Sequence, residues 1–329
     1  MPRLARLDIV GLLQHVMVRG IEQRNIFWDD LDRQHFLDRF VTLLAETKVR
    51  CFAWSLLSNH FHLLLMPTSR HLSCFMSRLL TGYAQSFNRR HNRSGHLFQN
   101  RYKSIVCEEE PYLLELVRYI HLNPLRAGLV ANLDELDRYP WCGHAILMGN
   151  GDLEMQETNS ILGRFSQTIT TARRNYRQFL QDGIPKGHRE DLVGGGLKRS
   201  QGERTNSDYE SFDERVLGCG DFVDGLKQEI LMRDKMKSTV TLVHLVNTIS
   251  AILSLDPDSV KMPSKNQALA TARGIISYLA LFELNFTGYE VGHLLHLGSS
   301  GVSLAARRGE RLLKTNLNLM NQIFTLLAK

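Results

Sequence analysis

The hydrophobic pattern of the first part of the chain predicts alternating strands and helices. Two apolar runs joined by Ser58-Asn59 give the signal of a β-hairpin, while large apolar residues recur at helical spacing between Asp29 and Thr47. Pro111 stands where a helix starts and Pro124 where it stops. Strands are expected at Leu13–Arg19, Val49–Leu57, His60–Met66 and Tyr102–Cys107, and helices at Asp29–Thr47, Leu72–His91 and Pro111–Leu122.

This order, β-α-β-β-α-β-α with a hairpin in the middle, predicts an α+β sandwich with a mostly antiparallel sheet and helices on one face. The sequence MGNGD at 148–152 marks a break. The first unit is therefore expected to span residues 1–150. A helical extension is expected at 151–185, with Tyr176 and Phe179 as its apolar anchors.

The rest of the chain changes in composition. Residues 186–211 are rich in Gly, Ser and charged residues, and they cannot bury enough apolar area to offset the entropy of ordering. A flexible linker is expected there, and an all-α unit at 212–329. Helical periodicity marks Val240–Leu253, Asn266–Leu284, Gly288–Leu297 and Ser299–Leu317. The short connection before the last of these is typical of a helix-turn-helix.

Composition narrows the class of protein only slightly. A chain of 329 residues suits two or three compact units, and a net charge of +6 weakly favours a polyanionic partner. Five widely spaced cysteines without a CxxC pair indicate a reduced, cytoplasmic protein. Asp8 and His15 interrupt the apolar run near the N-terminus, so we expect no signal peptide and no membrane segment.

Two short patterns carry candidate chemistry. His60 and His62 stand two residues apart in an expected strand, so both imidazoles project from one face while Phe61 points to the other. Such a pair is either a metal site or two hydrogen-bonded histidines at a sheet edge. Tyr119 and Asn123 are four residues apart and share a helix face. An amide oxygen could complete a metal site there, or the tyrosine is core and the asparagine a cap.

A basic segment follows the second expected helix. Cations without an acidic residue among them alternate there with Phe87, Phe98 and Tyr102, which suits phosphates and stacked bases of a single strand; the alternative is a solvated surface loop. Gly95 is expected to allow a sharp turn. The candidate DNA-binding residues of this part of the chain are Arg89, Arg90, Arg93, Arg101, Lys103, Arg118 and Arg126.

Three motifs together resemble the REP-associated tyrosine transposases, which belong to the HUH single-strand transposases. They are SNHFHLL at 58–64, SGHLFQNRYKS at 94–104 and YIHLNPLRAG at 119–128. HVMVRG at 15–20 and YPW at 139–141 also fit. The resemblance covers about residues 10–145.

The resemblance implies a ferredoxin-like antiparallel sheet and a defined chemistry. His60 and His62 match the metal-binding pair, Tyr119 matches the nucleophile, and Asn123 falls where that class carries a third ligand. Mg²⁺ or Mn²⁺ suits phosphate oxygens. The expected reaction is transesterification of single-stranded DNA through a 5′-phosphotyrosine, with a hairpin of the REP palindrome type as substrate. His121 is expected to be structural.

The C-terminal unit is similar to the duplex-binding domain of the replication initiator DnaA. The likeness rests on ARGIISYL at 272–279, TGYEVGHLL at 287–295 and SSGVSLAARR at 299–308. It implies that the helix from about Ser300 enters a major groove of duplex DNA. The candidate residues are Arg273, Ser300, Ser303, Arg307 and Arg308. The alternative is a helical oligomerisation module.

The sequence therefore predicts a metal-dependent DNA transposase. The alternative function is a DNA-binding regulator that kept the fold and lost cleavage. A relaxase fits less well, since relaxases usually carry the tyrosine near the N-terminus, far from the histidine pair. The pattern leaves open whether the protein is a monomer or a homodimer.

Overall fold

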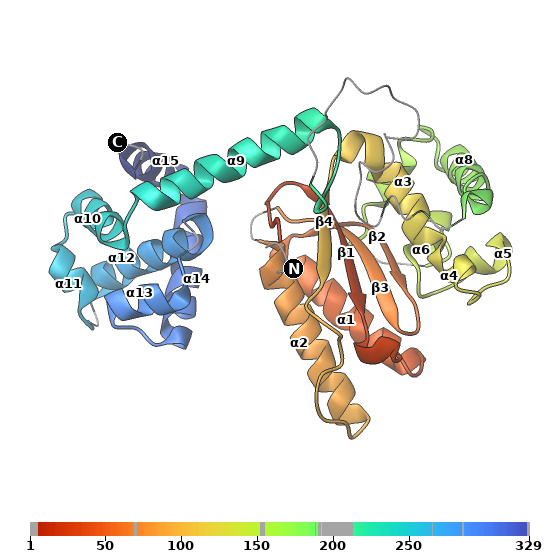
Figure 1. Cartoon of the computed structure of the whole chain (residues 1–329), viewed down its shortest axis with the longest axis horizontal. Helices are drawn as coiled ribbons and strands as arrows, with labels where there is room; N and C mark the ends of the chain where they lie inside the picture. The colour runs from red at the N-terminus through yellow and green to blue at the C-terminus, as the bar shows by residue number, and fades with distance from the viewer. Residues whose placement is uncertain are drawn as a thin grey trace. The chain divides into compact units, whose positions relative to one another are not determined.

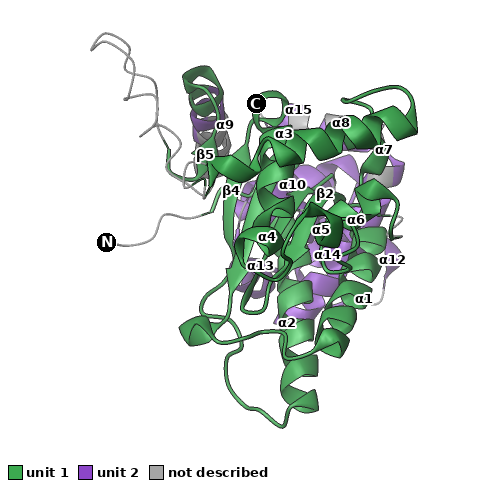
Figure 2. Ribbon diagram, turned by 90° about the vertical axis from the view of Figure 1, so that its right-hand side faces the viewer, with its two compact units in different colours: residues 1–224 green, residues 225–329 purple. Residues whose placement is uncertain are grey.

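The computed structural model describes residues 6–68, 71–151, 155–187, 189, 192, 213–264, 266–284 and 286–327, with the backbone alone at some positions of the last helices. The chain divides into two compact units, residues 1–224 and 225–329 (Figure 2). Most of the expected linker at 186–211 lies outside the described residues.

A five-stranded sheet forms the centre of the first unit (Figure 1). Its order is β2-β3-β1-β4-β5, and the first four strands pair antiparallel at the places that the hydrophobic pattern predicts. The fifth, which was not predicted, pairs parallel with β4 and makes the sheet mixed. The strands are β1 (Leu13–Arg19), β2 (Arg50–Leu56), β3 (His60–Met66), β4 (Lys103–Cys107) and β5 (Val216–Leu217).

Helices cover both faces of this sheet, so the prediction of helices on one face is wrong. Helices α1 (Asp30–Thr47) and α2 (Leu72–Arg90) pack on the face that carries Val16, Phe61 and Leu63. Helix α3 (Glu109–His121) packs on the opposite face, against Leu13 and Leu64. Alternate residues of a strand point to opposite faces, and β3 is apolar in both directions beyond its histidines. That pattern is typical of a strand buried on both sides.

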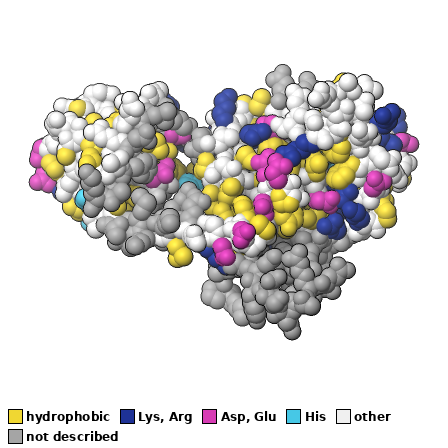
Figure 3. All heavy atoms as spheres, turned by 90° about the horizontal axis from the view of Figure 1, so that it is seen from above, with side chains coloured by type: hydrophobic (Ala, Val, Ile, Leu, Met, Phe, Trp, Pro, Cys, Tyr) yellow, Lys and Arg dark blue, Asp and Glu magenta, His cyan; other side chains and the backbone are white. Residues whose placement is uncertain are grey.

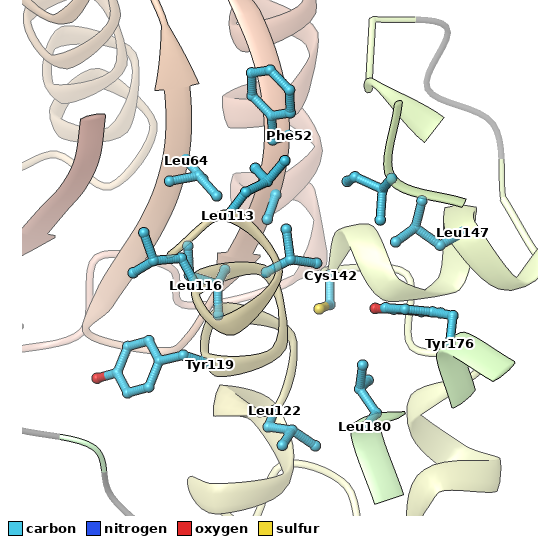
Figure 4. Close-up of a cluster of buried hydrophobic side chains, with 14 of the residues drawn as sticks. Phe52, Leu64, Leu113, Leu116, Tyr119, Leu122, Cys142, Leu147, Tyr176 and Leu180 are labelled. Atoms are coloured by element: carbon cyan, nitrogen blue, oxygen red, sulfur yellow. The ribbon is translucent and has the colours of Figure 1, made fainter. Parts of the chain in front are cut away.

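The segment that follows α3 belongs to the same apolar core. Its helices contribute Leu133, Leu147, Leu162 and Tyr176, and Figure 4 shows Leu147 and Tyr176 in the same cluster as Leu116 of α3. The expected extension is broken into short pieces, although Tyr176 is fully buried as predicted. The pieces are α4 (Asn123–Arg126), α5 (Leu133–Leu136), α6 (Gly143–Met148), α7 (Thr158–Leu162), α8 (Ile169–Gln181) and a 3-10 turn (Ile184–Lys186).

A buried polar network fixes the extension to the end of α3. The Tyr176 hydroxyl lies 2.7 Å from His121 Nδ1 and 3.2 Å from His144 Nδ1. His144 Nε2 in turn lies 2.7 Å from a carboxylate oxygen of Asp137. Hydrogen bonds in a low-dielectric interior are costly to break, so α3, α6 and α8 hold one another in place. His121 has the structural role that the sequence predicts.

The second unit is helical. The expected helices are present, and α9, α11 and α15 are additional. A π-helical turn (Leu279–Glu283) continues α12. None of the described helices is long and apolar enough to cross a membrane. The helices are α9 (Gly220–Thr239), which crosses the boundary between the units, α10 (Leu242–Ile252), α11 (Pro257–Lys261), α12 (Gln267–Tyr278), α13 (Gly288–Leu295), α14 (Ser299–Thr315) and α15 (Leu317–Leu327).

Helices α12 and α14 cross at a pair of glycines. A Cβ atom on Gly309 would lie 2.0 Å from the Gly274 carbonyl oxygen, and one on Gly274 would lie 3.0 Å from the Gly309 nitrogen. Only residues without a side chain allow the two backbones to approach this closely.

We predict that Gly309→Ala destabilises the helical unit by about 1–3 kcal/mol, since the added methyl meets backbone and forces the helices apart. Gly301→Ala, on the same helix, is the control, because its Cβ would meet Leu297 at an ordinary 3.6 Å and alanine favours helix. Amide hydrogen exchange of peptides from α12 and α14 measures both. Equal protection in the two variants would contradict the prediction.

Candidate active site

The histidine pair lies on the face of the sheet that α3 covers. Met17 of β1 stands opposite both His62 on β3 and Lys103 on β4, and Arg19 stands opposite His60. Residues directly opposite one another in antiparallel strands share a face. The two imidazole rings lie 5.3 Å apart between centroids, while Phe61 between them is buried in the other core.

Each of these rings has its Nδ1 atom engaged. His60 Nδ1 lies 2.6 Å from the Asn59 side-chain oxygen, to which it donates. Burial, assisted by the charge of Arg19, lowers the pKa of His60 to about 4, so the ring is neutral at physiological pH. His62 is 6% exposed, and its Nδ1 lies 3.0 Å from His15 Nε2. In both rings Nε2 is the nitrogen on the side away from these Nδ1 contacts, and it is the atom that a metal ligand of this kind would use.

His15 is a third imidazole that sequence reasoning did not include in the site. It lies on β1, is fully buried, and its ring stacks on that of His62 with centroids 5.2 Å apart. Its Nδ1 lies 3.3 Å from the Leu192 carbonyl oxygen. Burial lowers the pKa of His15 to about 4. A histidine inside an apolar strand was the available signal, because such a ring needs partners.

Tyr119 approaches both histidines from α3. Its ring lies 5.8 Å from that of His62 and 5.9 Å from that of His15, edge to face in each case. Figure 4 shows its hydroxyl directed away from the apolar side chains around Leu116. Burial raises the pKa of the Tyr119 phenol, and the positive charge of Arg126 opposes that shift.

Beside Tyr119 lies a small basic hollow. Arg126 places its guanidinium carbon 5.4 Å from the Tyr119 ring centroid, and its Nε is buried with no partner in the described part of the chain. Glu115 pairs with Arg118 and with Arg189. Four cations therefore face a single carboxylate. The lining residues are Glu115, Arg118, Tyr119, Arg126, Gly183, Lys186, Arg189 and Leu192.

The side chains at the site suit a divalent metal with nitrogen and oxygen ligands. No group of three or more His, Cys, Asp or Glu side chains among the described residues could hold a metal, so the fit depends on the two histidines and Asn123. Asn123 begins α4 after Leu122 and is 6% exposed, and one end of its side-chain amide has no partner among the described residues. Amide oxygen and nitrogen are assigned from their hydrogen bonds, and an oxygen at that end would offer a lone pair.

The predicted DNA-binding residues of the first unit are placed unequally. Arg89 and Arg101 are exposed, Lys103 lies on the sheet face of the histidines, and Arg118 packs 4.1 Å from the Phe179 ring. Arg93 is partly buried beside Phe87.

Parts of the basic segment need correction. Arg90 pairs with the carboxylates of Asp29 and Asp32 instead of facing a phosphate. Phe87 and Tyr102 are buried in the core beneath α1 and α2, so these rings are not available to stack on bases. Gly95 has a φ of +89°, which confirms the predicted turn.

The candidate residues of the second unit fall into two groups. Ser300, Ser303, Arg307 and Arg308 are exposed along one face of α14, while the other face packs on α12. Arg273 is only 6% exposed and donates to the Val260 carbonyl oxygen. Its prediction as a DNA contact is therefore corrected to a structural role.

Charge is mixed on the face of the molecule that Figure 3 shows. Lys and Arg side chains lie there among acidic and apolar ones, in keeping with the modest net charge of +6.

Comparison with known proteins found one family and a distant structural likeness. A solved structure described as the REP-associated tyrosine transposase bound to a REP hairpin is 16% identical, covers 48% of this chain and 98% of that chain, and has a TM-score of 0.39. A likeness at that level does not bear on the target of this chain. No curated protein matches the sequence. Residues 9–123 match the family described as transposase, IS200-like. The N-terminal part of the chain is therefore similar to an IS200-like transposase domain over these residues.

Proposed function

We propose that this protein cleaves and rejoins single-stranded DNA with Tyr119 as nucleophile and His60, His62 and Asn123 as metal ligands. The observation that carries the proposal is the position of Tyr119, whose ring meets that of His62 and also lines the basic hollow. A phosphate in the hollow would lie beside the nucleophile.

The chemical step needs a protonated tyrosine to become a nucleophile. The Tyr119 oxygen attacks phosphorus, the bond from phosphorus to the 3′ oxygen breaks, and the phenolic proton leaves as the 3′-hydroxyl forms. A bound Mg²⁺ or Mn²⁺ would polarise the phosphate and offset charge in the transition state. The covalent 5′-phosphotyrosine retains the phosphodiester energy, so the reverse attack rejoins strands.

The basic hollow supplies the charge that a scissile phosphate requires. Arg126 has a buried Nε without a partner in the part of the chain that the structure describes, and Lys186 and Arg189 come from the chain beyond the matched family domain. Positively charged donors aimed at developing negative charge act most strongly where water is excluded.

The helical unit is proposed to bind duplex DNA. Helix α14 follows α13 after three residues and presents Ser300, Ser303, Arg307 and Arg308 to solvent, which are the features of a recognition helix. A single-stranded hairpin of the REP type is the proposed substrate of the first unit, on the sequence resemblance of its three motifs.

Tyr119→Phe should abolish covalent attachment to labelled hairpin-bearing single-stranded DNA, because the nucleophilic oxygen is lost. A denaturing gel with Mg²⁺ detects the adduct, and EDTA should remove it from the wild type. Tyr112→Phe, on the same helix, should retain it. An adduct that persists in Tyr119→Phe would exclude this nucleophile. Binding without any adduct in the wild type, across varied hairpins, would favour the regulator.

Lys186→Gln should slow adduct formation about tenfold, since a charge-assisted hydrogen bond to phosphate contributes roughly 1.5 kcal/mol. The comparison is Lys48→Gln, which removes an exposed lysine of the same unit away from the hollow. Single-turnover rates measure the effect. Equal rates in the two variants would remove Lys186 from the phosphate site.

Arg307→Ala with Arg308→Ala should weaken duplex binding and reduce the slope of log affinity against log salt by about 2, as expected for two lost phosphate contacts. Adduct formation on single strands should not change. Lys261→Gln, on α11 of the same unit, controls for charge. Titration by fluorescence anisotropy measures binding, and a parallel loss of adduct formation would contradict the division of roles.

A further inference from the structure

We infer that His15 is a positioning residue that holds His62 in the tautomer able to bind a metal through Nε2. The inference rests on the proposed metal site. It follows from a chain of hydrogen bonds that runs from the Leu192 carbonyl through His15 to His62. His15 is not among the proposed ligands, and it acts on the reaction through His62.

The direction of this chain is set at its far end. A carbonyl oxygen accepts hydrogen bonds and never donates. The Leu192 oxygen lies 3.3 Å from His15 Nδ1, so that nitrogen carries the proton.

The middle of the hydrogen-bond chain is the His15 ring itself. His15 is 0% exposed, and its two ring nitrogens face different partners, Nδ1 the Leu192 carbonyl oxygen at 3.3 Å and Nε2 the His62 Nδ1 atom at 3.0 Å. Because Nδ1 carries the proton that is donated to the carbonyl, Nε2 offers the lone pair that faces His62.

The hydrogen bond from His62 to His15 determines the tautomer of His62. His62 Nδ1 must donate to His15, so a neutral His62 carries its lone pair on Nε2. His60 reaches the same state by another route, because its Nδ1 donates to the Asn59 oxygen at 2.6 Å. Both rings of the pair thus have an outer partner that fixes the tautomer and the ring orientation. Removal of such partners typically weakens metal binding 10- to 100-fold.

The hydrogen-bond chain also includes a residue from beyond the matched family domain. Leu192 lies outside residues 9–123, which match the family. It lines the same hollow as Tyr119. Through His15, the backbone carbonyl of Leu192 thus determines which ring nitrogen of His62 carries the proton.

Two variants of the full-length protein test separately the two hydrogen bonds that His15 makes, with Leu192 and with His62. In His15→Gln the side-chain oxygen reaches about as far as Nε2 and can accept from His62. In His15→Asn the amide nitrogen stands near the place of Nδ1 and can donate to Leu192, but the side chain is too short for His62. Isothermal titration with Mn²⁺ measures affinity, and thermal unfolding in EDTA shows that each variant is folded.

We expect His15→Gln to bind Mn²⁺ close to wild type and His15→Asn to bind about 10- to 100-fold more weakly. A His35→Gln variant on the exposed face of α1 controls for loss of a histidine, and His60→Ala should lose binding. Equal affinity of His15→Gln and His15→Asn, with binding lost in His60→Ala, would overturn the inference and leave the metal site intact. Wild-type affinity in His60→Ala, or no binding by the wild type, would overturn the proposed metal site and the inference with it.

Discussion

The nitrogen atoms of three imidazoles on one sheet face impose a strict constraint on this fold. His15 and His62 are buried there and His60 is half-buried, on the face that packs under α3. A buried polar atom without a partner costs about 1–3 kcal/mol, so the surroundings must provide acceptors in the right places. Asn59 and the Leu192 carbonyl are such acceptors. The polarity of the site therefore determines which backbone and side-chain groups come close to the sheet.

The proposed nucleophile, Tyr119, is itself firmly held. Tyr119 sits on a helix that packs on the sheet and is fixed at its end by the His121–Tyr176 hydrogen bond. Arg118, one residue away, donates to the Phe179 carbonyl oxygen. A catalytic side chain is most effective when packing and hydrogen bonds lock its position. The helical extension is thus part of the active-site framework.

Sequence patterns anticipated the central sheet because its signals are local. The alternation around His60-Phe61-His62 and the Ser58-Asn59 turn are readable within a few residues. Strand β5 has two residues, and it pairs with β4, which lies far away in the sequence. No local pattern therefore predicts it. The role of His15 depends on Leu192, far along the chain.

The burial of aromatic and basic side chains was the feature that the sequence predicted least well. Phe87 and Tyr102 alternate with cations as they would in a single-strand binding groove, yet the same spacing also buries them beneath the helices. Arg273 looks like a surface cation but donates to a carbonyl oxygen inside the helical unit. Long side chains carry charge and apolar surface together, so composition alone does not separate these outcomes.

The chain also closes off its own sheet. At one margin the Val106 nitrogen donates to the Arg215 carbonyl and the Glu108 nitrogen to that of Leu217. At the other, the Leu56 nitrogen donates to Trp141, and the Cys51 carbonyl accepts from Glu157. An exposed edge strand is a template for pairing with a strand of another protein chain. Later segments of the same chain occupy parts of both sheet edges. These segments therefore protect the protein against edge-to-edge association of its sheets.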